Sequence, residues 1–153
     1  MPVNIFVSYD HDDQQQINGF HGIKHNPNHD LDFRNHSLQE PVTDRHGNII
    51  KFPPSDPRSK PVRDEIKSKF ERASRLVVLI GDRTYTSEWV DWEIRIFFEM
   101  KSPLSGEKTW KRIRGMRLKG ADNAPTPSAL GGRSTQVMNW DPETLDLWLD
   151  QPI

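Results

Sequence analysis

The chain has 153 residues, of which 28% are charged and 33% hydrophobic, and it contains no cysteine. This length favours one domain over residues 1–153, and the lack of thiols excludes disulfides, zinc–thiolate sites and a cysteine nucleophile. No apolar run approaches the roughly 20 residues of a membrane span, and the opening residues do not have the features of a signal peptide. Because 21 Lys and Arg nearly balance 22 Asp and Glu, we expect a cytoplasmic protein that binds neither nucleic acid nor membrane.

Two apolar runs have the character of buried parallel strands. Residues 4–9 read Asn-Ile-Phe-Val-Ser-Tyr, and residues 75–81 form a nearly continuous apolar run that stops at glycine. Such runs are typical of strands that are covered on both faces. Weaker strand candidates are residues 31–33, 113–118 and 136–140.

Three helical patterns alternate with these strands. Apolar residues recur at helical spacing over residues 61–73, with Ser59 as a candidate cap. A longer pattern covers residues 87–100 and has Thr86 or Ser87 as its cap, and a last helix begins after Asp141 with proline and glutamate. Strands that alternate with helices predict right-handed βαβ units. We therefore predict an α/β, flavodoxin-like three-layer fold around a central parallel sheet of about five strands.

Two stretches do not fit this alternation. Residues 41–61 contain five prolines, and residues 120–135 contain two prolines and two adjacent glycines. Both compositions disfavour regular structure, and long loops in compact domains are often functional. We expect residues 41–58 to be irregular, to pass over the carboxyl end of the sheet and to help cover a site there.

Glu93 is a charged residue that falls on the apolar face of its predicted helix. With ~100° per residue and Trp89 at zero, Glu93 falls at about 40° and Phe97 at about 80°, so the carboxylate lies on the apolar face. It must be paired or placed in a cleft, because burying it alone is costly. A salt bridge to Arg83 or Arg114 is one explanation. The helix follows the second apolar run, however, and ligands of open α/β sheets bind at the carboxyl ends of the strands. We expect Glu93 to be partly buried beside such a cleft.

Other candidate sites carry weaker signals. Asp10 and Asp82 follow predicted strands, as in the acidic phosphoacceptor pocket of response regulators, although solvated loop acids are commoner. All six histidines lie in the first 46 residues without a zincin motif, and we expect no metal site. Residues 108–119 hold six Lys and Arg around Trp110; a solvated face is the first reading of this stretch and a phosphate-binding patch the second.

Several segments resemble the TIR-like domains. They are Ile-Phe-Val-Ser-Tyr-Asp at residues 5–10, residues 33–37, residues 76–84, Ser-Glu-Trp-Val-Asp-Trp-Glu-Ile at residues 87–94, and Asn-Trp-Asp at residues 139–141. The resemblance is to the subgroup that includes the TIR subunit of the bacterial Thoeris antiphage system. It implies a flavodoxin-like fold. Catalytic members cleave the nicotinamide–ribose bond of NAD with a glutamate on the third helix, and Thoeris members make a modified ADP-ribose that activates a separate effector protein.

The resemblance also implies a site. Glu93 stands at the catalytic position, and Trp89, one turn earlier, either packs in the core or stacks on a ring of the substrate. The residues expected to line the same cleft and bind the substrate are Ser8, Tyr9, Asp10, Asn35 and Ser37. NAD is then a substrate, no cofactor is needed, and the expected partners are NAD, the separate effector and other copies of the chain.

Two other functions are alternatives to the enzyme. A TIR domain that only scaffolds partners through its loops would be a non-catalytic interaction module. A phosphoacceptor domain would use Asp10 and Asp82, but no clear lysine ends a fifth strand after residues 136–140. A carboxylate on the packing face favours the enzyme, because a scaffold has no need of one.

Overall fold

The computed structural model describes residues 3–10, 29–33, 52–131 and 137–151. Within them, five strands form one sheet whose hydrogen-bonded order is β2-β1-β3-β4-β5. The strands are β1 (Val3–Ser8), β2 (His29–Phe33), β3 (Arg75–Ile80), β4 (Ile113–Arg117) and β5 (Val137–Met138). All four pairs of neighbours are parallel. The predicted parallel sheet of about five strands is confirmed, and its order is that of a flavodoxin-like fold.

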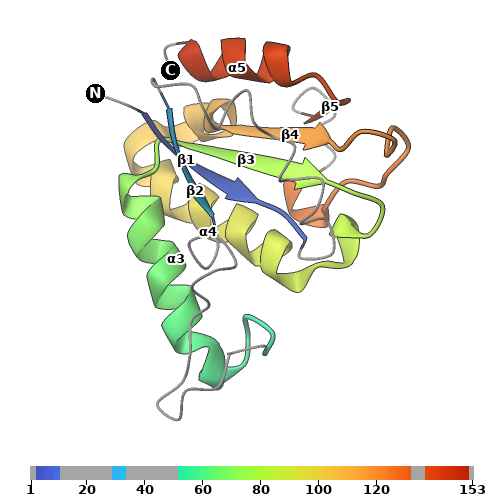
Figure 1. Cartoon of the computed structure of the whole chain (residues 1–153). Helices are drawn as coiled ribbons and strands as arrows, with labels where there is room; N and C mark the ends of the chain where they lie inside the picture. The colour runs from blue at the N-terminus through green and yellow to red at the C-terminus, as the bar shows by residue number, and fades with distance from the viewer. Residues whose placement is uncertain (1–2, 11–28, 34–51, 132–136, 152–153) are drawn as a thin grey trace.

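In the ranges that the structure describes, three α-helices flank this sheet as outer layers (Figure 1). Helices α3 (Lys60–Arg72) and α4 (Glu88–Ser105) cover one face, and α5 (Pro142–Asp150) covers the other. Helix α4 continues beyond the predicted end at residue 100 and includes Pro103. A 3₁₀ helix over Gly106–Arg112 then leads into β4. None of the helices in these described ranges is long and apolar enough to cross a membrane.

The helix ends follow local chemistry in two of three cases. The Ser87 hydroxyl accepts a hydrogen bond from the backbone N–H of Val90 at 3.2 Å, and the Asp141 carboxylate accepts one from Thr144 at 3.1 Å. Both predicted caps are therefore confirmed. Ser59 occupies the cap position before α3, as predicted, but its side chain makes no capping bond. Its hydroxyl is instead directed to the carbonyl oxygens of Phe52 and Pro53, at 3.1 and 2.7 Å.

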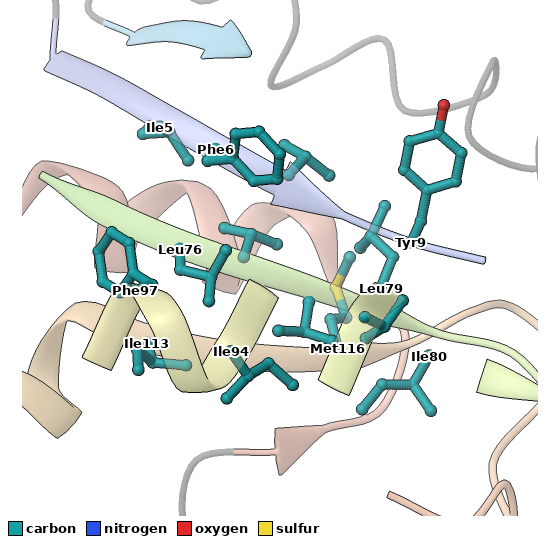
Figure 2. Packing of buried hydrophobic residues seen from close by; sticks show 14 of the residues in the cluster. Ile5, Phe6, Tyr9, Leu76, Leu79, Ile80, Ile94, Phe97, Ile113 and Met116 are labelled. Atoms are coloured by element: carbon teal, nitrogen blue, oxygen red, sulfur yellow. The ribbon is translucent and has the colours of Figure 1, made fainter. Parts of the chain in front are cut away.

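The core is centred on β3, in which all six residues are buried. On the α3 and α4 side, Phe70 of α3 packs edge-to-face against Phe6 of β1 and Phe97 of α4, with ring centroids 4.8 and 5.4 Å apart. Figure 2 shows Phe6, Leu76 and Phe97 among the packed side chains of this core. Burial on both faces explains why residues 76–80 of β3 are apolar without alternation.

The strand order fixes where a ligand site belongs. From β1 the chain passes to β2 on one side and then to β3 on the other, so β1 and β3 are neighbours at the point where the order reverses. Ser8, the last residue of β1, pairs with Val78 in β3. Ligands of open α/β sheets bind outside the carboxyl ends of the strands at this switch point.

Candidate functional site

Ser8 and Glu93 meet at the carboxyl end of β1. The Ser8 hydroxyl donates a hydrogen bond to Oε1 of Glu93 over 2.8 Å, although the two residues are 85 positions apart in the chain. Both residues are fully buried, with 0% of their surface exposed. The structure therefore brings together two of the residues expected to form the site. Glu93 is more deeply buried than predicted.

The face that α4 turns toward the sheet explains this burial. Its fully buried side chains follow the i, i+3, i+4, i+7 pattern of one helix face. They are Val90, Glu93, Ile94 and Phe97, each with 0% exposure. Trp89, Ile96 and Met100 flank this stripe and are only half-buried. Glu93 is thus near the middle of the packing face, where its carboxylate needs a hydrogen-bond donor.

The two arginines considered as partners of Glu93 lie elsewhere. The Arg114 guanidinium stands 5.0 Å over the ring of Trp148 in α5, which covers the face of the sheet opposite to α4. Arg83 is exposed in the connection between β3 and α4. Burial lowers the pKa of Arg114, whose Nε is buried without a hydrogen-bond partner. The alternative of a salt bridge between Glu93 and Arg114 is therefore wrong.

Trp89 connects the start of α4 to the described end of the proline-rich segment. Its indole Nε1–H donates to the carbonyl oxygen of Phe52 over 3.0 Å, and its ring packs edge-to-face on Trp92 with centroids 5.6 Å apart. Of the predicted loop 41–58, residues 41–51 lie outside the described residues. Residues 52–56 form a turn, and a 3₁₀ helix over Pro57–Ser59 follows it, so the predicted segment is irregular only up to residue 56 of its described part. The turn contacts the first turn of α4 through the bond between Trp89 and Phe52.

Of the four remaining predicted site residues, the structure describes Tyr9 and Asp10. Figure 2 shows Tyr9 directed away from Ile94 and Phe97 of α4, and the ring is buried with 3% exposure. Asp10 is half-buried just after β1. Asn35 and Ser37 lie outside the described residues.

Asp91 has contacts that the sequence pattern did not indicate, since it falls on the polar side of the helical wheel. Its Oδ1 accepts hydrogen bonds from the Ser128 hydroxyl and the Ala129 backbone N–H, both at 2.9 Å. Its Oδ2 accepts one from Arg95 at 3.2 Å. The Arg95 contact has the i, i+4 spacing of a helix pair, whereas no local signal indicates the other two. Asp91 thereby fastens the connection between β4 and β5 to α4.

An open cavity of about 590 Å³ lies on the outer side of α4. It is lined by Pro54, Ser55, Arg63, Tyr85, Thr86, Ser87, Glu88, Asp91, Trp92 and Arg95. Glu93 is absent from this lining because its side chain points to the sheet on the opposite side of the helix. Glu93 is therefore distinguished by its burial and its hydrogen bond, and not by a cavity beside it.

The structure gives little support to the weaker candidate sites of the sequence analysis. Within the described ranges, no group of three or more His, Asp and Glu side chains is arranged to hold a metal ion. Asp82 is exposed after β3. The basic stretch is not a uniform solvated face, because several arginines tie elements together. Arg112 donates to the carbonyl oxygen of Ser74 at 3.1 Å, and Arg117 donates to that of Ala124 at 3.1 Å.

This parallel sheet, with helices on both faces and a polar site at the switch point, is that of a flavodoxin-like α/β domain. The model of one protein family, the TIR-like domain of the Thoeris protein ThsB, matches residues 6–113. The match spans more than half of the chain, and the chain belongs to this family. Membership suggests a role in antiphage defence. A comparison with curated proteins finds no match.

Proposed function

We propose that this protein cleaves the nicotinamide–ribose bond of NAD and converts the rest of the dinucleotide into an ADP-ribose-derived signal. Glu93 is the catalytic residue, and the signal activates a separate effector protein in antiphage defence. The observation that carries the proposal is the Glu93 carboxylate itself, fully buried at the switch point of the sheet and hydrogen-bonded to Ser8. Membership of the Thoeris TIR-like family supports the same assignment.

The chemistry needs one well-placed anion. When the C1′–N bond of NAD breaks, the electron pair leaves with nicotinamide, which becomes neutral and needs no general acid. The ribosyl centre is left with oxocarbenium character, which a nearby carboxylate stabilises as it does in glycosidases. Water or another nucleophile then captures the ribosyl centre. Half-buried Trp89, one turn before Glu93, and Asp10, after β1, are the described side chains proposed to contact the substrate beside it.

A second function is favoured by one observation. Glu93 is fully buried, and the described cavity on α4 lies on the other side of the helix. A non-catalytic TIR module that binds partners through its surface would need no access to this carboxylate. In that case Glu93 and Ser8 would form only an internal polar contact.

Nicotinamide release decides between these two functions. Wild type, Glu93→Gln and Glu99→Gln are compared, with NAD as substrate, as purified proteins over a range of concentrations and in phage-challenged cells. Glu99 is the matched control because it is exposed on the same helix. We expect wild type and Glu99→Gln to release nicotinamide and Glu93→Gln to be about 10²-fold slower or more, the scale of losing one electrostatic stabiliser.

The melting temperature is measured on the same preparations. A catalytic Glu93 predicts that Glu93→Gln folds like wild type but is inactive. A Glu93→Gln protein that releases nicotinamide at the wild-type rate would exclude Glu93 as the catalytic residue. Absence of release by wild type in both settings would favour the interaction module.

A further inference from the structure

We infer that Ser8 is a positioning residue, whose hydroxyl holds the Glu93 carboxylate in the orientation that cleavage requires. The inference rests on the function proposed above and assigns to Ser8 a role different from direct contact with NAD. Its basis is the hydrogen bond from the Ser8 hydroxyl to Oε1 of Glu93, 2.8 Å long, between two side chains with 0% exposure.

The hydrogen-bonding capacity of serine favours this role. A serine hydroxyl carries a single proton, and here that proton is donated to Glu93. A substrate group that accepted a hydrogen bond from Ser8 would have to displace a buried carboxylate, which would then lose a donor. Removing a donor from a buried charged acceptor is costly, so the existing contact is the favoured one.

The position of Ser8 in the sheet gives the contact its rigidity. Strand β1 is held between β2 and β3, and Ser8 itself pairs with Val78. Glu93, by contrast, has a long side chain with three rotatable bonds. A hydrogen bond from a group on a central strand to one carboxylate oxygen reduces the number of orientations that the carboxylate can adopt. Preorganised charge of this kind needs no rearrangement during the reaction, and small misplacements of a reacting group reduce the rate strongly.

The test is a steady-state comparison of Ser8→Ala and Ser8→Thr under the conditions in which wild type releases nicotinamide from NAD. Positioning predicts that Ser8→Ala lowers kcat about tenfold with KM unchanged, the scale of one hydrogen bond to a charged group. Ser8→Thr keeps the hydroxyl and should recover most of kcat. Ser74→Ala is the matched control, because it removes a part-buried hydroxyl at the opposite end of the sheet, and it should leave kcat and KM at wild-type values.

The possible results distinguish the positioning role of Ser8 from the proposed enzymatic function. Ser8→Ala with wild-type kcat, or with raised KM and unchanged kcat as expected for a substrate contact, would overturn the positioning role while leaving the enzyme assignment intact. If Ser8→Thr fails to fold because its extra methyl overpacks the site, the split between kcat and KM in Ser8→Ala alone decides. No release by wild type overturns the proposed function and the positioning role together.

Discussion

Glu93 and Arg75 are both charged side chains inside this fold, and each is held by a different kind of contact. Glu93 accepts from a neutral hydroxyl at the carboxyl end of the sheet. Arg75, at the first position of β3, donates to the carbonyl oxygens of Trp148 and Gln151 and lies 4.9 Å over the ring of Trp148. Burial, and then the nearby Arg112, lower the pKa of the Arg75 guanidinium. Both carbonyls lie at the carboxyl end of α5, and that of Trp148 also accepts the backbone N–H of Gln151. Arg75 therefore adds a charged donor to this helix terminus.

Replacing Arg75 should therefore destabilise the protein. We expect Arg75→Met to lower the free energy of unfolding by about 1.5–3 kcal/mol, the range for hydrogen bonds to a charged group. Arg75→Lys should recover only part of the loss, because an ammonium group cannot reproduce the planar fork of arginine. Urea unfolding measures the change, with exposed Arg83→Met as the control that should stay within 0.5 kcal/mol or so of wild type. Wild-type stability in Arg75→Met would contradict the role in ending α5.

Among the described elements, the turn before α3 is held by several local polar contacts. Asp56 accepts from the backbone N–H of Arg58 at 2.8 Å and from its side chain at 2.7 Å, while Arg58 stacks 3.5 Å over the ring of Phe52. Arg63 donates to the carbonyl oxygens of Pro54 and Asp56. The turn therefore holds the carbonyl of Phe52 in the place where it accepts from Trp89 of α4.

The pH dependence of this turn follows from Asp56. The hydrogen bonds from Arg58 lower the pKa of Asp56 from 3.8 to about 2. Because the folded-state pKa is the lower one, its stabilising effect is complete above pH 3.8 and is lost as the pH falls through about 2. We expect Asp56→Asn to melt below wild type at pH 5, with a difference that shrinks as the pH falls to 2. Exposed Asp122→Asn is the control. A gap between wild type and Asp56→Asn that is constant from pH 5 to pH 2 would refute this account.

At the scale of the whole molecule, a row of three aromatic rings connects the sheet to helices α3 and α4. Phe70 links β1 to α4 through its contacts with Phe6 and Phe97, and all three rings are fully buried. Edge-to-face pairs of this kind contribute beyond the apolar area that they bury. The same layer holds Glu93 against Ser8, so its packing also positions the site.

Truncating Phe70 should affect the fold as a whole. We expect Phe70→Ala to lower the free energy of unfolding by about 3–5 kcal/mol, since it removes a buried ring and leaves a cavity. Phe70→Leu should cost less because it fills more of the space. Leu147, which is 66% exposed on α5, provides the control Leu147→Ala, with an expected change within about 0.5 kcal/mol. Equal losses from Phe70→Ala and Leu147→Ala in denaturant unfolding would show that this row of aromatic rings does not support the core.

The amino-acid sequence by itself determined the elements and the face on which Glu93 lies. Apolar runs predict β1 and β3, and helical spacing places Glu93 on the packing side of α4, because both periodicities are set by the local geometry of the backbone. Only the tertiary structure decided which groups those side chains meet. The Ser8 donor to Glu93 is 85 residues away, and the Ser128 turn reaches Asp91 across 37. Such partners depend on strand order, register and the packing of helices across the sheet, which no local period encodes. For the same reason Arg114 lies on Trp148, on the opposite face of the sheet from Glu93.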